Sequence, residues 1–190
     1  MKKRFTAILL AAVLVLSLLS VQVFAAETVP DGWTPIYTLA DLQDAIDGYS
    51  AKNLILMNDI DANNEDISHY SSDSITVVDG IREDMVLDGN GHTIYNLKTT
   101  LLRYNQGTVR NLNTTIHDTS EDEEHLKYFM SANYSGAKIS IAGITLKNSG
   151  TIEDCRTRFT LQGERSSVSL ALAGIAMYNY GEIRDRKSVV

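Results

Sequence analysis

The chain has 190 residues, with 17 Lys or Arg against 24 Asp or Glu, and its formal net charge at pH 7 is −7. An acidic chain repels phosphate backbones and anionic headgroups, so nucleic acid is excluded as the expected partner. Cys155 is the single cysteine, which rules out an internal disulfide, so an apolar core and backbone pairing have to supply the stability.

The first 25 residues have the pattern of an export signal. The basic segment KKR at 2–4 precedes the apolar run AILLAAVLVLSLLSV, and VFA at 23–25 offers small residues for signal peptidase. A membrane anchor is the alternative, but the run is shorter than the ~20 residues that a spanning helix needs. We therefore expect cleavage of residues 1–25, which leaves a secreted or cell-surface chain of 165 residues with net charge −10 and no transmembrane helix.

An extended lead-in and one helix are expected next. Both prolines lie in the lead-in, residues 26–37. The helix is predicted over 38–48, because Thr38 and Asp41 form an approximate capping box and Gly48 can end the helix. One face of this helix is apolar and consists of Leu39, Leu42, Ala45 and Ile46.

The apolar segments that follow predict β-strands. NLILMNDI at 53–60 is a short apolar run that ends in a turn at Asn58-Asp59. ITVVDG at 75–80 and MVLDGNGHTIYNL at 85–97 are expected to form further strands, the second interrupted by a turn at DGNG.

A sequence repeat dominates the second half of the chain. AGITLKNSGTIEDC at 142–155 and AGIAMYNYGEIRDR at 173–186 lie 31 residues apart and are identical at seven of fourteen positions. The identical positions are apolar or turn-type residues, which is typical of a structural unit that stacks on a copy of itself.

Shorter segments extend this repeat toward the N-terminus. HTIYNL at 92–97, GTVRNL at 107–112, GTIEDC at 150–155 and GEIRDR at 181–186 share a β-branched residue followed two positions later by Asn or Asp. A glycine begins or precedes each segment, and we expect it to supply the positive φ of a corner. The aligned residues are separated by 15, 43 and 31 positions, and they are Ile94, Val109, Ile152 and Ile183. The step of 15 is too short for a repeat of ~20–45 residues, while the step of 43 contains a polar segment that we expect to loop out, HDTSEDEEH at 117–125.

Stacked repeats would also bring equal polar side chains together. Neighbouring strands lie ~4.8 Å apart, so an Asn amide can bond to the equivalent Asn of the next repeat. The expected ladders join Asn96 to Asn111 and Asn148 to Asn179.

Several of these segments together resemble a known family. WTPIYTLADLQDAID, LILMNDIDA, LDGNGHTIYNL and the recurring Asn-x-Gly-x-Ile/Val-x-Asn/Asp pattern are similar to bacterial surface proteins with GLUG-type repeats. The resemblance covers about residues 33–186. It implies an all-β fold, a right-handed parallel β-helix of the pectate-lyase-like kind. It also implies a short N-terminal capping helix at 38–48 and β-helix coils over 49–186.

The last residues depart from this pattern. The repeat predicts an apolar residue or Cys at position 186, where the chain has Arg186. DRKSVV resembles the translation of a sequencing adapter, so we expect residues 187–190 to be a non-native tail and the chain to be a fragment of a longer protein.

No standard metal site is expected from the sequence. His117 and His125 flank an acidic segment, but their spacing matches no zinc site. Asp59, Asp61 and Asn63 occupy the first ligand positions of an EF-hand loop, whose later glycine and glutamate are missing.

A pair of stacked carboxylates leaves calcium open as an alternative. Asp154 would lie above Asp185, where two carboxylates repel unless both are solvated or a cation bridges them. The cofactor prediction is therefore none, with weak Ca²⁺ binding as the alternative.

The sequence offers no supported catalytic residue. Cys155 occupies an inward repeat position, where a buried packing role is favoured over that of a nucleophile. Arg103, Arg110 and Arg184 match no lyase motif. We therefore assign no catalytic, cofactor-binding or metal-binding residue, and the interpretation leans against an enzyme.

The aromatic residues suggest a contact surface as one interpretation. Tyrosine is equally ordinary on a half-buried β-sheet, so carbohydrate contact and plain packing both remain open for Tyr95, Tyr104, Tyr128, Tyr134, Tyr178 and Tyr180. The leading hypothesis is an exported β-solenoid for adhesion or for contact with glycans or host surfaces. The alternatives are an incomplete β-helix polysaccharide lyase or hydrolase, or an accessory module of a surface peptidase. The oligomeric state is left open.

Overall fold

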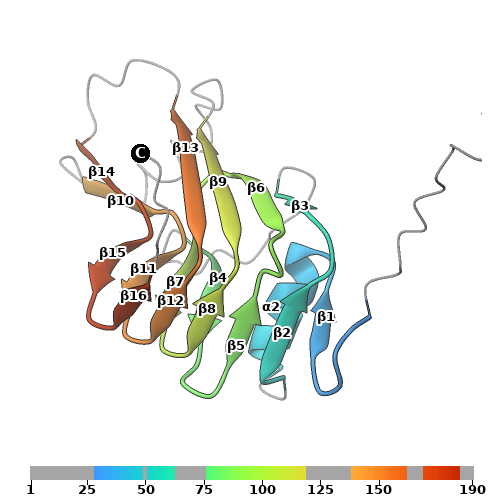
Figure 1. Ribbon diagram of the computed structural model, residues 1–190. Helices are drawn as coiled ribbons and strands as arrows, with labels where there is room; N and C mark the ends of the chain where they lie inside the picture. Colours follow the sequence, from blue (N-terminus) through green and yellow to red (C-terminus); the bar gives the residue numbers. More distant parts are fainter. Residues whose placement is uncertain (1–27, 49–50, 63–75, 119–137, 162–168, 185–190) are drawn as a thin grey trace, which may run out of the picture.

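The computed structural model describes residues 28–48, 51–62, 76–118, 138–161 and 169–184. These residues form one helix, α2 (Leu39–Asp47), and four parallel β-sheets (Figure 1). The predicted signal peptide and the predicted non-native tail lie outside the described residues. In the part of the chain that is described, no helix has the length and apolar character needed to cross a membrane.

Most strands belong to three sheets, A, B and C, and two more strands form the small sheet D. Sheet A consists, in spatial order, of β1 (Thr34–Ile36), β2 (Asn53–Leu56), β5 (Val86–Asp88), β8 (Thr108–Arg110), β12 (Thr151–Glu153) and β16 (Glu182–Arg184). Sheet B consists of β3 (Ile60–Asp61), β6 (Thr93–Leu97), β9 (Asn113–Asp118) and β13 (Arg156–Leu161). Sheet C consists of β4 (Thr76–Ile81), β7 (Thr100–Asn105), β11 (Thr145–Asn148) and β15 (Ala176–Asn179). Sheet D pairs β10 (Lys138–Ala142) with β14 (Ser169–Ala173).

The chain visits these sheets in a fixed order. From β4 onward it passes from sheet C to sheet A and then to sheet B, and the strands of sheet D lie between B and C in the last two passages. Each passage, called a circuit below, lays its strands parallel to those of the preceding circuit. Figure 1 shows the strands of sheet A in one row, from β1 at the blue end to β16 at the red end. The described chain is therefore mostly parallel β-sheet with one helix, in agreement with the expected all-β class.

The predicted strands are confirmed with slightly different bounds. The segment 53–60 contains β2 and the start of β3, separated by the predicted turn. The segment 75–80 corresponds to β4, and 85–97 holds β5 and β6 on either side of the DGNG turn. The predicted lead-in contains an additional strand, β1, which pairs with β2 and begins sheet A.

Circuit length varies mainly at one place. Only two residues separate β7 from β8, β11 from β12 and β15 from β16, and the same holds between β8 and β9 and between β12 and β13. In contrast, β9 ends at Asp118 and β10 begins at Lys138, while β13 ends at Leu161 and β14 begins at Ser169. The predicted polar loop at 117–125 begins in β9, and its remainder lies outside the described residues.

The register of sheet A corrects the expected alignment of the short repeats. Val109 of β8 is paired with Leu87 of β5 and not with Ile94, which lies in sheet B opposite Thr114. One inward apolar residue of each strand from β2 to β16 stacks in a column, in which the last member is partly buried and the others are buried. The column consists of Leu54, Leu87, Val109, Ile152 and Ile183. Its steps are 33, 22, 43 and 31 residues. The short step of 15 was a false equivalence between segments on two different sheets.

The repeat glycines are needed for close approach and not for positive φ. Among them only Gly91, in the DGNG turn, has a positive φ, which is 80°. A Cβ atom on Gly150 would collide with the carbonyl oxygen of Gly107, and a Cβ atom on Gly181 would collide with that of Gly150. Glycine is therefore required in this column because the backbones of adjacent circuits touch there.

In the three repeat segments whose ends are described, the positive φ belongs instead to the next-to-last residue, an Asn or Asp. Asn96, Asn111 and Asp154 have φ values of 60°, 51° and 50°, a region that short polar side chains tolerate best. The predicted bond from Asn96 to Asn111 is wrong. Asn96 donates to Asp61 at 2.9 Å and Asn111 donates to Asp88 at 3.1 Å, because Asn96 lies inside β6 whereas Asn111 lies at the corner between β8 and β9. Asp185, the expected neighbour of Asp154, lies outside the described residues.

Helix α2 closes the N-terminal end of the stack. The predicted capping box is confirmed, since the Asp41 amide donates to Thr38 Oγ1 and the Thr38 amide donates to Asp41 Oδ2, both at 3.0 Å. Leu39, Leu42 and Ile46 are buried in the common core, whereas Ala45 is only partly buried. The helix packs against β1 and β4, so its apolar face covers the core residues of the first circuit.

Candidate functional site

Among the residues that the structure describes, the two most exposed aromatic side chains lie beside a lysine of sheet C. Lys147 of β11 is paired with Tyr104 of β7 on one side and with Tyr178 of β15 on the other. The Lys147 ammonium lies 5.6 Å from the centre of the Tyr180 ring. Tyr178 is 57% exposed and Tyr180 is 72% exposed. We call Tyr104, Lys147, Tyr178 and Tyr180 the tyrosine–lysine row.

An internal ladder of amides holds this row in register. The Asn105 amide donates to Asn148 Oδ1, and the Asn148 amide donates to Asn179 Oδ1, both at 2.8 Å. The predicted Asn148–Asn179 bond is thus confirmed, and Asn105 extends the ladder by one circuit. Each Asn directly follows or precedes a member of the row in the sequence. Asn105 and Asn148 are buried and Asn179 is exposed. The amide ladder therefore fixes which outer side chains become neighbours on adjacent strands.

Tyr104 rests on a glycine of the neighbouring strand. Gly80 of β4 is opposite Tyr104 in the register. A Cβ atom at Gly80 would lie 2.8 Å from Cδ2 of the tyrosine ring, so the ring occupies the space that a side chain would need. The ring is consequently half-buried and less free to move than the exposed Tyr178 and Tyr180.

The row combines aromatic faces with one positive charge. Within the described residues no carboxylate lies within ion-pair distance of Lys147. Arg103, the neighbour of Tyr104 in β7, lies 3.5 Å from the Asp79 carboxylate. Aromatic faces and an ammonium group can contact the apolar face and the oxygen atoms of a sugar ring. This chemistry supports binding and supplies no nucleophile or base.

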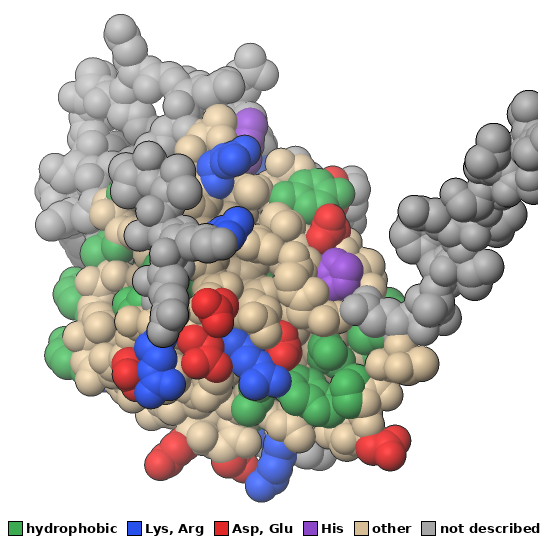
Figure 2. Space-filling view, viewed as in Figure 1, with side chains coloured by type: hydrophobic (Ala, Val, Ile, Leu, Met, Phe, Trp, Pro, Cys, Tyr) green, Lys and Arg blue, Asp and Glu red, His purple; other side chains and the backbone are tan. Residues whose placement is uncertain are grey.

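Sheet A carries a different arrangement, an alternating row of charges. Successive strands place Asp88, Arg110, Glu153 and Arg184 at one register position. Arg110 Nε donates to Asp88 Oδ2 at 2.7 Å, and its guanidinium lies 5.6 Å from the centre of the Trp33 ring. Arg184 Nη1 lies 3.8 Å from Glu153 Oε2. Figure 2 shows acidic and basic side chains side by side over this face. The alternation lets each charge pair with its neighbour on the adjacent strand.

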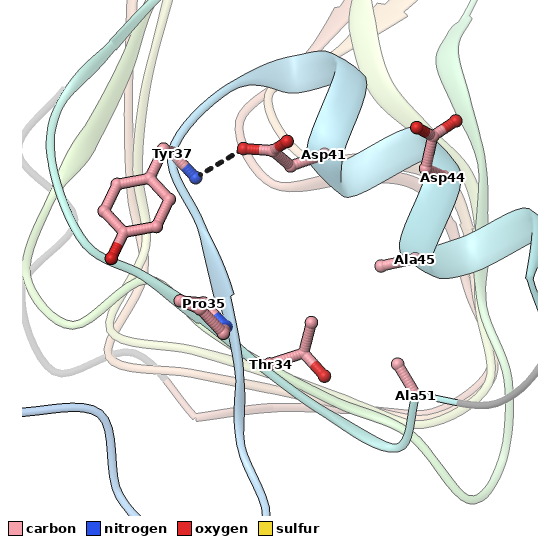
Figure 3. Close-up of a pocket in the computed structure, with 7 residues that line it drawn as sticks. All are labelled: Thr34, Pro35, Tyr37, Asp41, Asp44, Ala45 and Ala51. Atoms are coloured by element: carbon pink, nitrogen blue, oxygen red, sulfur yellow. Dashed lines mark hydrogen bonds between the residues drawn. The ribbon is translucent and has the colours of Figure 1, made fainter.

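A pocket of about 450 Å³ opens between β1 and α2 (Figure 3). Its lining consists of Thr34, Pro35, Tyr37, Asp41, Asp44, Ala45 and Ala51. The Asp41 carboxylate accepts from the amides of Tyr37 and Thr38, both at 3.0 Å, so it is committed to holding the start of the helix.

The residues that were weighed as metal ligands in the sequence do not share a site, because each described carboxylate has its own hydrogen-bond partner. Asp59 Oδ1 accepts from the Thr93 amide at 2.8 Å, and Asp61 Oδ1 accepts from the Asn96 side chain at 2.9 Å. Asn63 and His125 lie outside the described residues, and His117 lies in β9. Across the described ranges, no three His, Cys, Asp or Glu residues gather as a metal site would require.

The other candidates also do not converge. Cys155 is buried in the core, as predicted, with its Sγ 3.2 Å from the carbonyl oxygen of Glu153. Arg103 lies on sheet C, whereas Arg110 and Arg184 lie on sheet A two strands apart. The structure therefore does not bring the three arginines to one place.

The predicted tyrosines divide into two groups. Tyr104, Tyr178 and Tyr180 meet on or beside sheet C, while Tyr95 lies on sheet B and Tyr128 and Tyr134 lie outside the described residues. Lys147 was missed by the sequence interpretation. Its signal was its position directly before Asn148 in the repeat, the position that Tyr104 and Tyr178 hold before Asn105 and Asn179.

Comparisons with known proteins add no family assignment. No protein-family model, no curated protein and no solved structure matches this chain.

Proposed function

We propose that the chain is an exported right-handed parallel β-helix, with α2 as its N-terminal cap. Three observations support this proposal: the fixed order of sheets C, A and B, the parallel pairing of successive circuits, and the inward columns of apolar, Asn and Gly residues. The basic and apolar start of the sequence supports export to the cell surface or medium.

The proposed role is adhesion through contact with a surface glycan. The observation that carries it is the tyrosine–lysine row, in which the half-buried Tyr104 and the exposed Tyr178 and Tyr180 lie around Lys147. Adjacent strands are ~4.8 Å apart, so Tyr104 and Tyr178 are separated by roughly two strand spacings. A short run of sugar rings fits along such a row.

The experiment measures binding of the exported chain to a panel of immobilised cell-surface glycans. Tyr178→Ala and Tyr180→Ala remove the exposed rings and are expected to weaken binding about tenfold each, because each aromatic contact contributes ~1 kcal/mol beyond its area. Tyr37→Ala is the matched control, since Tyr37 is 51% exposed but lies at the helix cap.

Three outcomes contradict this function. Binding that is unchanged in both row variants, or equally weakened in the Tyr37 control, places the ligand elsewhere. Absence of binding to every glycan in the panel removes the adhesion proposal. Release of unsaturated or shortened sugar chains from the panel would show a lyase or hydrolase instead.

A further inference from the structure

The turn between β5 and β6 contains a dipeptide that is chemically labile in unfolded chains. The turn has the sequence DGNG at 88–91, and the dipeptide is Asn90-Gly91. Because glycine has no Cβ atom, its main-chain nitrogen is poorly shielded and can attack the side-chain carbonyl carbon of a preceding Asn. This attack closes a five-membered succinimide ring and releases ammonia, which is the first step of deamidation.

The attacking nitrogen is engaged in the folded chain. The Gly91 N–H donates to the carbonyl oxygen of Asn111 at 2.9 Å. Asn111 lies at the corner between β8 and β9, so this bond joins the turn to the next circuit. Attack requires the Gly91 nitrogen to give up its proton and to turn toward the Asn90 side chain. The hydrogen bond opposes both changes, since breaking it leaves a main-chain acceptor without its donor.

The Asn90 side chain is held by the circuit on the other side. Its Nδ2 donates to the carbonyl oxygen of Leu56, the last residue of β2, at 3.3 Å. The Asn90 main-chain amide donates to Asp88 Oδ1 at 2.8 Å. The two reacting groups are thus bonded to different neighbours, the nitrogen to the following circuit and the side chain to the preceding one.

The turn lies between described strands on both sides. Strand β5 pairs with β2 and β8, and β6 pairs with β3 and β9 (Figure 1). Asp88 is only 7% exposed, and its carboxylate accepts from Arg110 Nε at 2.7 Å and from Asn111 Nδ2 at 3.1 Å. The corner that engages the Gly91 amide therefore also anchors the first residue of the turn.

We propose that Asn90-Gly91 is a latent deamidation site, which the closed stack silences and which reacts when the turn separates from the corner at Asn111. In the separated turn the Gly91 nitrogen bonds to Asn90 Cγ and the Cγ–Nδ2 bond breaks. The Nδ2 group leaves as ammonia and carries away the proton from the Gly91 nitrogen. Water then opens the succinimide and yields aspartate or isoaspartate at position 90.

The product no longer fits the closed turn. An oxygen replaces the Nδ2 donor, so it has no proton to share with the Leu56 carbonyl oxygen. The new carboxylate also lies two residues from that of Asp88, and like charges disfavour each other. Isoaspartate in addition lengthens the main chain by one carbon atom. Separation of these circuits therefore leaves a permanent chemical record, and it weakens the turn in which that record is made.

The test compares deamidation of the exported chain under folding conditions and in concentrated urea, with peptide mapping by mass spectrometry. Modification of Asn90 is expected to be at least about tenfold slower in the folded chain, because an opening that breaks two hydrogen bonds is rarely populated. Asp31-Gly32 is the internal control, since it forms the same succinimide by loss of water. Both of its residues are exposed, and within the described chain no hydrogen bond engages the Gly32 amide. Its rates in the folded and unfolded chain should be similar.

Two matched variants locate the effect at the corner. Asn111→Ala and Asn96→Ala each remove an Asn with positive φ, 51° and 60°, whose side chain donates to an Asp. Only Asn111 supplies the carbonyl that holds Gly91. Asn111→Ala is therefore expected to speed deamidation of the folded chain several-fold, and Asn96→Ala to leave the rate close to that of the wild-type chain. Urea denaturation of both variants measures their global stability.

Three results would overturn the proposal. Equal rates at Asn90 in the folded and unfolded wild-type chain would show that the fold gives no protection. A slow rate in the unfolded chain would show that the local sequence, and not the fold, silences the site. Equal acceleration by the two variants would show that global unfolding, and not separation at this corner, controls the reaction.

Discussion

The two ends of the stack contain similar apolar residues in very different surroundings. At the N-terminal end, Ile36, Leu39 and Leu42 are buried because α2 folds over the first circuit. At the other end, Leu172 is 43% exposed and Ile183 is only partly buried. Each circuit repeats the same inward pattern, so the difference arises from what covers it. An apolar position in this fold contributes fully to stability only when a neighbour lies on both sides.

The largest expected difference between interior and end concerns the apolar column of sheet A. Ile152→Ala removes a buried side chain between two circuits and is expected to lower the free energy of unfolding by about 2–5 kcal/mol. Ile183→Ala makes the same chemical change at the end and should cost clearly less, because that side chain is partly exposed. Urea denaturation of both variants measures the difference. Equal losses would show that the end is as well covered as the interior.

A matched pair of glycines gives a second test of the same comparison. Gly143 and Gly174 hold the same position in the two copies of the repeat. A Cβ atom on Gly143 would collide with the Gly174 carbonyl and with Thr157, whereas nothing lies within 4 Å of one on Gly174. Gly143→Ala is therefore expected to destabilise the fold by about 1–3 kcal/mol. Gly174→Ala should be neutral or slightly stabilising, since Ala reduces the entropy of the unfolded chain. Thermal unfolding checks both, and a costly Gly174→Ala would mean that another backbone covers this position.

A variant of the capping box measures how much this cap stabilises the N-terminal end of the stack. Thr38→Ala removes the oxygen that accepts from the Asp41 amide and is expected to cost about 1 kcal/mol. Thr38→Ser keeps the oxygen and serves as the control. Hydrogen exchange should show the loss mainly in α2 and β1, which α2 contacts. Equal effects of Ala and Ser would show that the side-chain oxygen does not matter.

The smallest expected effect concerns one exposed ion pair near each end of the stack and its contribution to the free energy of unfolding. The hydrogen bond from Lys52 holds the pKa of Asp84 below its ordinary value of 3.8, and the hydrogen bond from Arg184 holds the pKa of Glu182 below 4.5. A lowered pKa stabilises the fold above the ordinary value, and this contribution disappears as the pH falls through the lower folded value. Both carboxylates are exposed, so the effect at either end is small.

Unfolding of Asp84→Asn and Glu182→Gln between pH 2 and pH 6 measures these contributions. Each variant is expected to differ from the wild-type chain only at the upper end of this range, and the difference should shrink in concentrated salt. A large difference at low pH would contradict the assignment of the two pairs.

The sequence predicted local features well because short-range physics determines them. The capping box at Thr38 and Asp41 and the buried position of Cys155 follow from a few neighbouring residues. The Asn148–Asn179 bond was also predictable, because the two fourteen-residue copies of the repeat align without gaps and place these two residues at the same position.

Features that depend on register between distant strands were missed. The segments 92–97 and 107–112 are similar in sequence, and both hold an Asn with positive φ. Asn96 nevertheless lies at an irregularity inside β6, whereas Asn111 lies at a corner. The sequence named three tyrosines of the tyrosine–lysine row among its candidates, but Lys147 was missed for a similar reason. Lys147 and Tyr180 meet only because β11 and β15 pair in one particular register.

The uneven circuit lengths have a practical consequence. The two-residue corners between sheets C, A and B are constant in the later circuits, and the extra residues fall where the chain leaves sheet B, after Asp118 and after Leu161. Foreign peptides inserted at these two points would lengthen connections that already differ by several residues, while the hydrogen-bonded frame keeps its spacing. The chain thus offers a scaffold for peptide grafting in which the permitted insertion points are spaced by whole layers.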